Sequence, residues 1–510
     1  MSTTPPNPEP TRASTPPDAR TGILAGGLAL TTVGTCALIT LAAFESLAVT
    51  TIMPVVSDEL GGASLYSLAF AAPIASSVVG MVGAGIWADR RGPARPLVAA
   101  IVVFTIGLIV AGLALAMPAL VAGRFVQGFG SGAMTVSIYV LVAKLYPPPL
   151  HPKIFAAFAA AWVVPSLVGP LVAGIVADTA GWRWVFLGVV ALVAAAGVLV
   201  APALRSLGRN AGEPELPNDD GAVAAPGTRR PLGATTRLGL SAAVAVAVVT
   251  LSLSAELPDA TRWFAGAAAL VAIAVLVRPL LPPGTFTARR GLPSAVLLRG
   301  LIAATFFTTE VYLPLLLHDR YGLPPWLSGV TLTAGAIAWA SGSAIQGRAG
   351  DSVPHRVFMR VGGSLLFAGT VVQVVTAAFM LHPVVAVIGW FLAGAGMGLM
   401  FPRITTIVLA SSDRGEEGRN TSALSLSEAV GASVSLALSG LVFTLMTAAS
   451  PVGPVISVGT FPGQFVLDDG TSVAPFVATL GYTAVVALIA LAVAFVVGLP
   501  SKREARDARS

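Results

Sequence analysis

Long apolar segments recur along almost the whole chain, and they constrain its fold more than any other feature. Fourteen such runs can be marked in the 510 residues. A helix needs about 20 mostly apolar residues to cross a bilayer. Only 11% of the residues are charged, against about 25% in a soluble globular protein. The sequence therefore predicts an all-α polytopic membrane protein and excludes an ordinary soluble enzyme.

The apolar runs form two groups of six with a pair between them. The runs lie at about 26–54, 65–87, 97–115, 118–144, 154–177, 182–203, 237–255, 263–282, 292–317, 327–347, 357–380, 383–410, 421–448 and 473–499. We expect a disordered cytoplasmic tail, a six-helix bundle, a polar cytoplasmic loop, an extra pair of transmembrane helices, a second six-helix bundle and a cytoplasmic tail, at residues 1–25, 26–204, 205–236, 237–282, 283–500 and 501–510.

Two segments leave alternatives open. The central pair is short, so 237–282 could instead form one re-entrant hairpin. The stretch 450–472 has alternating apolar residues and turn residues, which favour a small β-hairpin about as much as an irregular loop.

Basic residues are distributed unevenly about these runs. With a cytoplasmic N-terminus, the outside loops hold only Arg183, Arg262 and Arg320, and Arg124 lies within a run. The remaining Lys and Arg fall on the cytoplasmic side or in the tails, as the positive-inside rule expects. We therefore predict a multi-pass plasma-membrane protein with both termini in the cytoplasm. The net charge of +6 needs no nucleic-acid partner, because no basic stripe with interleaved aromatic residues occurs.

Several kinds of site are excluded by residue usage. Cys36 is the only cysteine, and the four histidines lie far apart without ligand spacing. No Gly-rich loop of the GxxxxGK[ST] type offers an ATP site, and no Ser-His-Asp set can be placed. We expect no cofactor, no metal site and no enzymatic activity.

The segment that joins the second and third runs has the sequence GIWADRRGPAR over residues 85–95. Gly85 would let two helices approach closely, and Gly92 lies in the turn. Asp89 can accept from helix N-terminal amides and from arginines such as Arg90 and Arg95. Such a loop would act as a charge clamp that holds one conformation; a solvated basic turn is the plain alternative.

The fourth and fifth runs combine polar residues with small ones. An arginine two turns into an apolar helix costs about 2.5–3.5 kcal/mol to insert, so Arg124 should meet a carboxylate, a carbonyl or water, or else extend to the interface. Gln127 follows one turn later, and Gly128 with Gly132 forms a small-residue packing face. The fifth run contains two prolines, which kink a helix. Its motif comprises Pro165, Gly169, Pro170 and Gly174.

These three motifs, in this order and spacing, resemble those of the major facilitator superfamily: its loop motif, its fourth-helix motif and the antiporter motif of its fifth helix. The segment GWRWVF at 181–186 and the segment FESLAVTTIMP at 44–54 are similar to motifs of the fourteen-helix drug:proton antiporters. The resemblance covers nearly all of residues 25–500. It implies two pseudo-symmetric six-helix bundles plus two linker helices, multidrug efflux and a monomeric state. We expect Trp182 and Trp184 to anchor the sixth helix at the membrane interface.

This chain departs from the family pattern in a few places. Glu45 replaces the usual aspartate, and Pro93-Ala94 replaces a basic pair, which would loosen the loop clamp. Pro165 and Ala173 replace glycines of the antiporter motif. A degenerate second copy of the loop motif, GRAGDSVPHR at 347–356, fits an internal repeat.

Three carboxylates lie inside apolar runs: Glu45, Glu310 and Glu428. An intramembrane acid is a functional hypothesis by default, and an apolar environment favours the neutral form of a carboxyl, so such a group can load and release a proton. Because Glu45 and Glu310 belong to the first helix of each half, both could face a central cavity. Phe306, Phe307, Tyr312, Trp339 and Trp390 could line it, although packing in the core is the more common role for such aromatics.

The function that this pattern indicates is secondary transport by alternating access. A proton from outside would neutralise Glu45 or Glu310, displace a lipophilic cationic drug or metabolite, and allow closure to the inward state. Such a chain would confer antibiotic resistance, with protons, membrane lipids and a small lipophilic substrate as its partners. A uniporter, a symporter or a lipid exporter of the same fold is the alternative.

Overall fold

The computed structural model describes residues 22–24, 28–147, 150–210, 233–349, 352–412, 417–449 and 472–497. Within these residues the regular secondary structure is helical throughout. The segments predicted as tails (almost all of 1–25, and 501–510), most of the loop 205–236, and residues 450–471 of the segment expected to form a hairpin or an irregular loop lie outside the described residues. So do Gly350 and Asp351 of the second-half loop motif.

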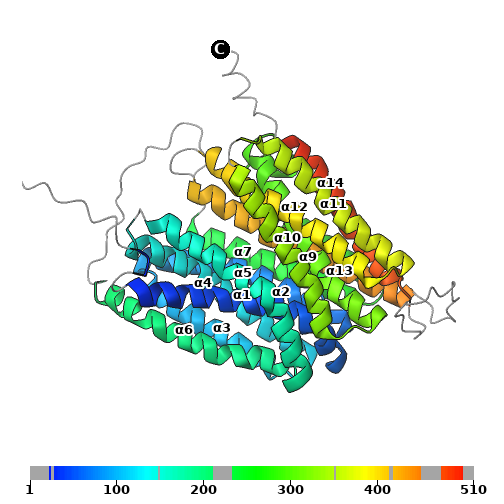
Figure 1. The fold of residues 1–510 in the computed structure, drawn as a ribbon, viewed down its shortest axis with the longest axis horizontal. Helices are drawn as coiled ribbons and strands as arrows, with labels where there is room; N and C mark the ends of the chain where they lie inside the picture. Colours follow the sequence, from blue (N-terminus) through cyan, green and yellow to red (C-terminus); the bar gives the residue numbers. More distant parts are fainter. Residues whose placement is uncertain are drawn as a thin grey trace, which may run out of the picture.

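Six helices form the part of the molecule that we call the N half (Figure 1). They are α1 (Leu28–Glu59), α2 (Leu68–Arg91), α3 (Ala94–Gly112), α4 (Met117–Leu145), α5 (His151–Ala180) and α6 (Arg183–Asn210). Helix α4 packs against both α2 and α3, while α1 packs against α5 and α6. A single 3-10 turn, η1 (Ala63–Leu65), connects α1 to α2.

Six further helices form the C half. They are α9 (Leu292–Tyr321), α10 (Pro325–Ala349), α11 (His355–Phe379), α12 (Pro383–Ala410), α13 (Glu417–Ala449) and α14 (Ala474–Val497). Here α12 packs against α10 and α11, just as α4 packs against α2 and α3 in the N half. The two halves meet through α5 against α10 and through α2 against α13.

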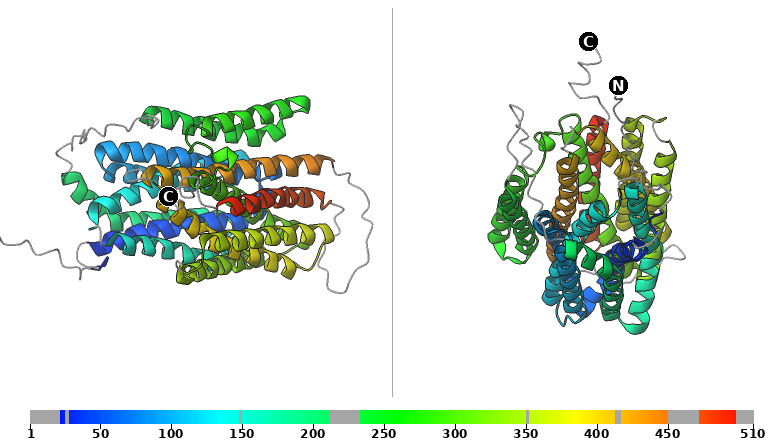
Figure 2. Two further views of the ribbon diagram at one scale, coloured as in Figure 1. Left: turned by 90° about the horizontal axis from the view of Figure 1, so that it is seen from above. Right: turned by 90° about the vertical axis from the view of Figure 1, so that its left-hand side faces the viewer.

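The central pair consists of two separate helices, α7 (Ala234–Leu253) and α8 (Asp259–Val277), joined through the turn η3 (Ser254–Glu256). Each belongs to a segment long and apolar enough to cross a membrane. The pair, coloured green, lies at the edge of the molecule in both views of Figure 2. Helix α7 packs against α2 and α13, and α8 packs mainly against α7.

Thirteen of the described helical segments are long and apolar enough to span a membrane. Helix α10 is the long helix that does not meet this criterion, because Gly, Ser and Thr lower its hydropathy. Helix α10 lies against α5, α9 and α12, so neighbouring protein covers part of its surface. The fold is therefore an all-α bundle of two six-helix halves with two additional helices.

Small residues set the spacing between α2 and α4. A Cβ atom added at Gly128 would overlap the backbone of Pro73, and one at Gly132 would overlap the carbonyl oxygen of Ser77. The predicted packing face on α4 is therefore present. The prediction for Gly85 is wrong, because a Cβ there would meet Val136 at an ordinary 3.7 Å. Gly80, more than one turn earlier on α2, makes the close approach instead.

Candidate functional site

A cavity of about 460 Å³ lies between the two halves. Helices α1, α2, α4 and α5 of the N half and helices α9 and α13 of the C half line it. Both Glu45 and Glu310 are among the lining residues, together with Arg124 and Gln127. Two acids that lie 265 positions apart in the sequence thus share one chamber, because each lies on the first helix of its half.

Glu45 is fully paired within the N half. Arg124 of α4 donates to the Glu45 carboxylate, and the side chains of both are only 6% exposed. The same guanidinium donates to Gln127 Oε1 at 2.8 Å and, through Nε, to the carbonyl oxygen of Ala69 at 3.3 Å. The arginine that is expensive to insert therefore meets a carboxylate and a carbonyl rather than extending to the interface.

Glu310 has a different environment. It lies on α9 at the cavity wall and is partly exposed there. Within the described residues no hydrogen bond or ion pair compensates its carboxyl group. An ionised carboxylate in a water-poor site is unfavourable without such a partner. The group is therefore suited to hold a proton or to pair with a cation that enters the cavity.

Aromatic side chains form one wall of the cavity. Tyr139 of α4 stacks on Phe158 of α5, with ring centroids 6.2 Å apart and planes at 12°, and Phe155 meets Tyr139 edge-on at 5.4 Å. Trp162 follows one turn further along α5 and is half-exposed. This wall offers apolar faces and π surfaces, which attract planar apolar molecules and cations.

The aromatic residues expected from the C half divide between cavity and core. Phe307 lines the cavity. Phe306 stacks on Trp390 at 4.3 Å and meets Trp339 edge-on, so these rings pack within the C half. Tyr312 is buried against Phe443 and Tyr66. The aromatic wall of the cavity therefore comes mainly from α4 and α5, whose aromatic residues the sequence did not single out.

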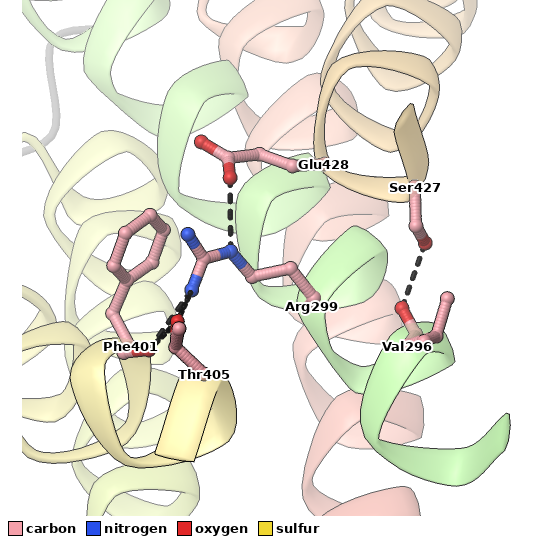
Figure 3. Close-up of polar contacts among 6 residues, drawn as sticks. All are labelled: Val296, Arg299, Phe401, Thr405, Ser427 and Glu428. Carbon is pink, nitrogen blue, oxygen red and sulfur yellow. Dashed lines mark hydrogen bonds and ion pairs between the residues drawn. The ribbon is translucent and has the colours of Figure 1, made fainter. Parts of the chain in front are cut away.

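Glu428 is paired with Arg299, which belongs to none of the motifs in the sequence (Figure 3). Arg299 Nε donates to Glu428 Oε2 at 2.9 Å, and its Nη1 donates to the carbonyl oxygen of Phe401 at 2.9 Å. The guanidinium also lies over the Phe401 ring. Arg299 thus ties α9 to α12 and α13. The count of basic residues on each side of the membrane groups Arg299 with the cytoplasmic residues, yet Arg299 lies inside α9 and is buried. Its position as a lone arginine in an apolar run is the feature of the sequence that could have indicated a buried partner.

The two halves are in contact at the end of the molecule that holds η1, here named the η1 end (residues 58–66 and 318–326). Tyr66 donates to the carbonyl oxygen of Val311 at 3.0 Å, and His318 Nε2 lies 3.1 Å from Asp58 Oδ2. Deeper along the interface, Thr333 of α10 donates to the carbonyl oxygen of Leu167 at 3.1 Å. The aromatic wall lies toward the opposite end, where α4 ends and α5 begins.

The η1 end also brings together side chains that the sequence did not suggest as a group. Asp58, His318 and Asp319 each offer a ligand atom, and these atoms lie within 4.8 Å of one another. Carboxylate and imidazole are ligand types that divalent cations accept. The grouping arises only in the fold, because 260 residues separate Asp58 from His318 in the sequence. The expectation that the chain has no metal site stays a prediction.

The α5 motif lies at the junction of the halves. A Cβ at Gly174 would overlap the backbone of Trp326 on α10, and one at Gly329 would lie 2.8 Å from the backbone of Pro170. Gly169 instead faces Phe44, and a Cβ added there would lie 3.4 Å from the ring. The motif therefore provides a close contact surface between α5 and α10 rather than a lining for the cavity.

The charge clamp predicted for the loop between α2 and α3 is not formed. Asp89, Arg90 and Arg95 are exposed, and none has an ion pair with another described residue. No side chain caps the start of α3. Gly92 ends α2 with a φ of 75°, a conformation that glycine adopts readily. In this conformation the loop is a solvated basic turn.

Trp182 is not an interface anchor. It is 2% exposed, and its Nε1 donates to Glu59 Oε2 at 2.8 Å. Arg183 donates to the other oxygen of Glu59 at 2.6 Å and lies over the Trp182 ring. The motif therefore ties α6 to the end of α1, while Trp184, 58% exposed, faces outward.

Comparison with known proteins identifies the class. The family model described as Major Facilitator Superfamily matches residues 34–436, so the chain belongs to that superfamily of multi-pass membrane transporters and is not an enzyme. It is 27% identical over 439 residues to a probable multidrug-efflux transporter of Mycobacterium tuberculosis, covering 82% of this chain and 86% of the relative. It is 22% identical over 426 residues to the multidrug efflux pump SdrM of Staphylococcus aureus, covering 82% and 90%.

Solved structures of similar fold are also transporters. A peptide transporter of the POT family in complex with sulfate superposes with a TM-score of 0.60 and 17% identity, covering 91% of this chain and 94% of that one. A bacterial homologue of the lysosomal transporter Spinster superposes with a TM-score of 0.59 and 14% identity, covering 93% and 97%. At these identities the likeness concerns the fold.

Proposed function

We propose that this chain exports lipophilic, cationic drugs or metabolites across the plasma membrane in exchange for protons, by alternating access. The observation that carries the proposal is the cavity between the halves, whose lining combines the unpaired carboxyl of Glu310 with an aromatic wall. An acid without a partner can bind either a proton or a cation, and not both at once. The proton and the cationic substrate would therefore compete for the Glu310 carboxyl.

The direction of transport follows from orientation. The positive-inside rule places the basic loop between α2 and α3 in the cytoplasm, so the η1 end faces outward. The halves are joined at that end, by Tyr66 to Val311 and by His318 to Asp58. The conformation is then closed toward the outside, and the open loop clamp at Asp89 agrees with separation of the halves at the cytoplasmic end. A substrate would enter past the aromatic wall.

The roles of the two acids differ in this scheme. Arg124 neutralises Glu45, so this pair would fix α1 to α4 and shape the cavity. Glu310 would take up a proton when the cavity opens outward, which releases the cationic substrate. After closure of the η1 end it would release that proton inward and accept the next substrate. Exchange of one proton for one monovalent cation moves no net charge, so the pH gradient supplies the driving force, about 1.36 kcal/mol per pH unit.

The multidrug-efflux relatives support the substrate class, since the chain matches most of their length. The test is dye efflux in a bacterial host that lacks its own major pumps, with and without a protonophore. We expect the parent chain to expel a fluorescent lipophilic cation and to lose this activity with protonophore. Glu310→Gln should abolish efflux, and Glu256→Gln, an exposed acid outside the cavity, should retain it.

Proteoliposomes separate the alternatives. The parent protein should drive dye against its gradient when an imposed pH gradient supplies protons from the opposite side. Full pH-coupled transport by Glu310→Gln would contradict the proposed role of this acid. Protonophore-sensitive accumulation of a nutrient, with unchanged drug susceptibility, would make the chain a symporter instead.

A further inference from the structure

A second cavity lies away from the interface between the halves, at the end of α8. Its volume is about 610 Å³, and eleven residues of the segment 274–289 line it. The lining combines apolar side chains, including Val275 and Phe286, with the guanidinium-bearing side chains of Arg278 and Arg289. The turn η4 (Thr285–Thr287) forms part of its wall. The transport scheme gives this cavity no role.

The charge at this cavity is entirely positive. The segment 278–290 contains Arg278, Arg289 and Arg290 and no Asp or Glu. All three arginines are exposed, and none forms an ion pair with any residue in the described parts of the chain. The two guanidinium groups that line the cavity, those of Arg278 and Arg289, have no carboxylate among the other lining residues, which favours an anionic ligand.

The backbone around the cavity is held in place by internal hydrogen bonds. Thr285 is buried, and its hydroxyl donates to the carbonyl oxygen of Pro282 at 2.7 Å. The backbone amide of Arg289 donates to the carbonyl oxygen of Gly284 at 3.1 Å. Gly284 has a φ of 88°, which a glycine adopts without strain. The loop therefore presents Arg289 from a formed wall, so little ordering is needed when a ligand binds.

The position of the cavity indicates where the anion comes from. Helix α8 lies at the edge of the molecule (Figure 2). Only 22% of its residues 260–277 are buried by other parts of the protein. Val271 and Val275 are each 63% exposed on it, which suits contact with acyl chains. The arginines follow directly where this apolar helix ends, at the boundary where lipid head groups lie.

We propose that this cavity binds the phosphate head group of an anionic phospholipid. Arg278 and Arg289 pair with the phosphate oxygens, because the planar guanidinium matches phosphate with two parallel hydrogen bonds. Val275 and Phe286, exposed at the rim, contact the glycerol and the first part of the acyl chains. A cavity of about 610 Å³ exceeds what a phosphate group alone fills, so an amphiphile occupies it better than a free ion.

The test uses the full-length protein purified in a neutral detergent, with lipid binding counted by native mass spectrometry. Phosphatidylglycerol is the anionic probe, phosphatidylcholine the matched lipid without net charge, and inorganic phosphate the free anion. We expect one tightly bound phosphatidylglycerol per chain, and neither of the other probes at the same concentration. Arg278→Gln with Arg289→Gln should weaken binding about 25-fold, since each basic residue at a lipid surface contributes about fivefold.

Two controls separate this site from general charge effects. Arg237→Gln with Arg356→Gln removes two exposed arginines at the same end but outside the cavity, and should bind phosphatidylglycerol like the parent. Arg278→Lys with Arg289→Lys keeps the charge and should retain most of the affinity, which also shows that the segment is folded. Equal binding by the Gln pair and the parent, or equal binding of phosphatidylcholine, would overturn the proposal. Tight binding of inorganic phosphate would overturn the assignment to a lipid.

Discussion

The ion pair between Glu45 and Arg124 allows a quantitative prediction, because both side chains are almost completely enclosed. Each is 6% exposed, so solvent screening does not reduce the interaction to the 0–1 kcal/mol that is usual for a surface pair. Glu45→Gln leaves the Arg124 charge buried with two neutral acceptors, Gln127 Oε1 and the carbonyl oxygen of Ala69. Removal of one partner of a buried pair costs about 3–5 kcal/mol.

The double variant should be less destabilised than either single variant. Arg124→Gln alone leaves the Glu45 carboxylate unpaired, and the combined Glu45→Gln/Arg124→Gln change leaves two neutral amides instead. We therefore expect a coupling energy of about 3 kcal/mol in a double-mutant cycle. The assay is equilibrium unfolding of the full-length protein in mixed micelles with increasing SDS, followed by tryptophan fluorescence.

The matched control is Glu256→Gln, an exposed acid outside the cavity, which should change the unfolding free energy by no more than about 0.5 kcal/mol. If the two single variants each lost less than about 1 kcal/mol and their effects were additive, the pair would not be the structural clamp that the geometry indicates. Glu45 would then be as free as Glu310 to exchange protons, and the division of roles between the two acids would be refuted.

Three further predictions concern other contacts. Gly132→Ala places a Cβ against the α2 backbone, so it should destabilise the protein by about 1–3 kcal/mol in the same SDS titration, whereas no loss would contradict the close packing. Asp58→Asn weakens the contact with His318 at the η1 end. Because a pair this exposed contributes at most about 1 kcal/mol, the ratio of closed to open molecules should fall by up to about fivefold. The ratio is measured from distances between spin labels on the two halves, and an unchanged distance distribution would argue against a latch. Arg299→Gln leaves Glu428 without its partner and should cost about 1–3 kcal/mol, checked by SDS unfolding with Arg356→Gln as the exposed control; equal stability of the two variants would contradict a clamp.

The helical architecture was predictable from the sequence because hydrophobic length is a local property. Every apolar run of about 20 residues must become a helix in a bilayer, since no water is present there to bond the backbone. Helix ends were less predictable. Helix α1, for example, extends to Glu59 instead of ending near residue 54, because Glu59 accepts from Arg183 of α6 and Asp58 contacts His318 of α9.

The candidate site was predictable only in part. Glu45, Arg124 and Glu310 stand out in the sequence, because a charged residue in an apolar run is expensive. Which of these three side chains form an ion pair depends on their distances in the folded protein. Arg124 could have met Glu45, Glu310 or water, and the approach of α1 to α4 decided for Glu45. The aromatic wall gave no signal, since Tyr139, Phe155 and Trp162 look like ordinary membrane-facing residues.

The sequence by itself determined the class of fold, the number of helices and the residues that could not remain uncompensated inside a membrane. Only the tertiary structure decided that Glu45 is neutralised while Glu310 stays free, that Arg299 holds Glu428, and that the halves meet at the η1 end. The reason is physical. Burial and helix formation depend on neighbours along the chain, whereas an ion pair or a contact between halves depends on atoms a few ångströms apart that hundreds of residues separate in sequence.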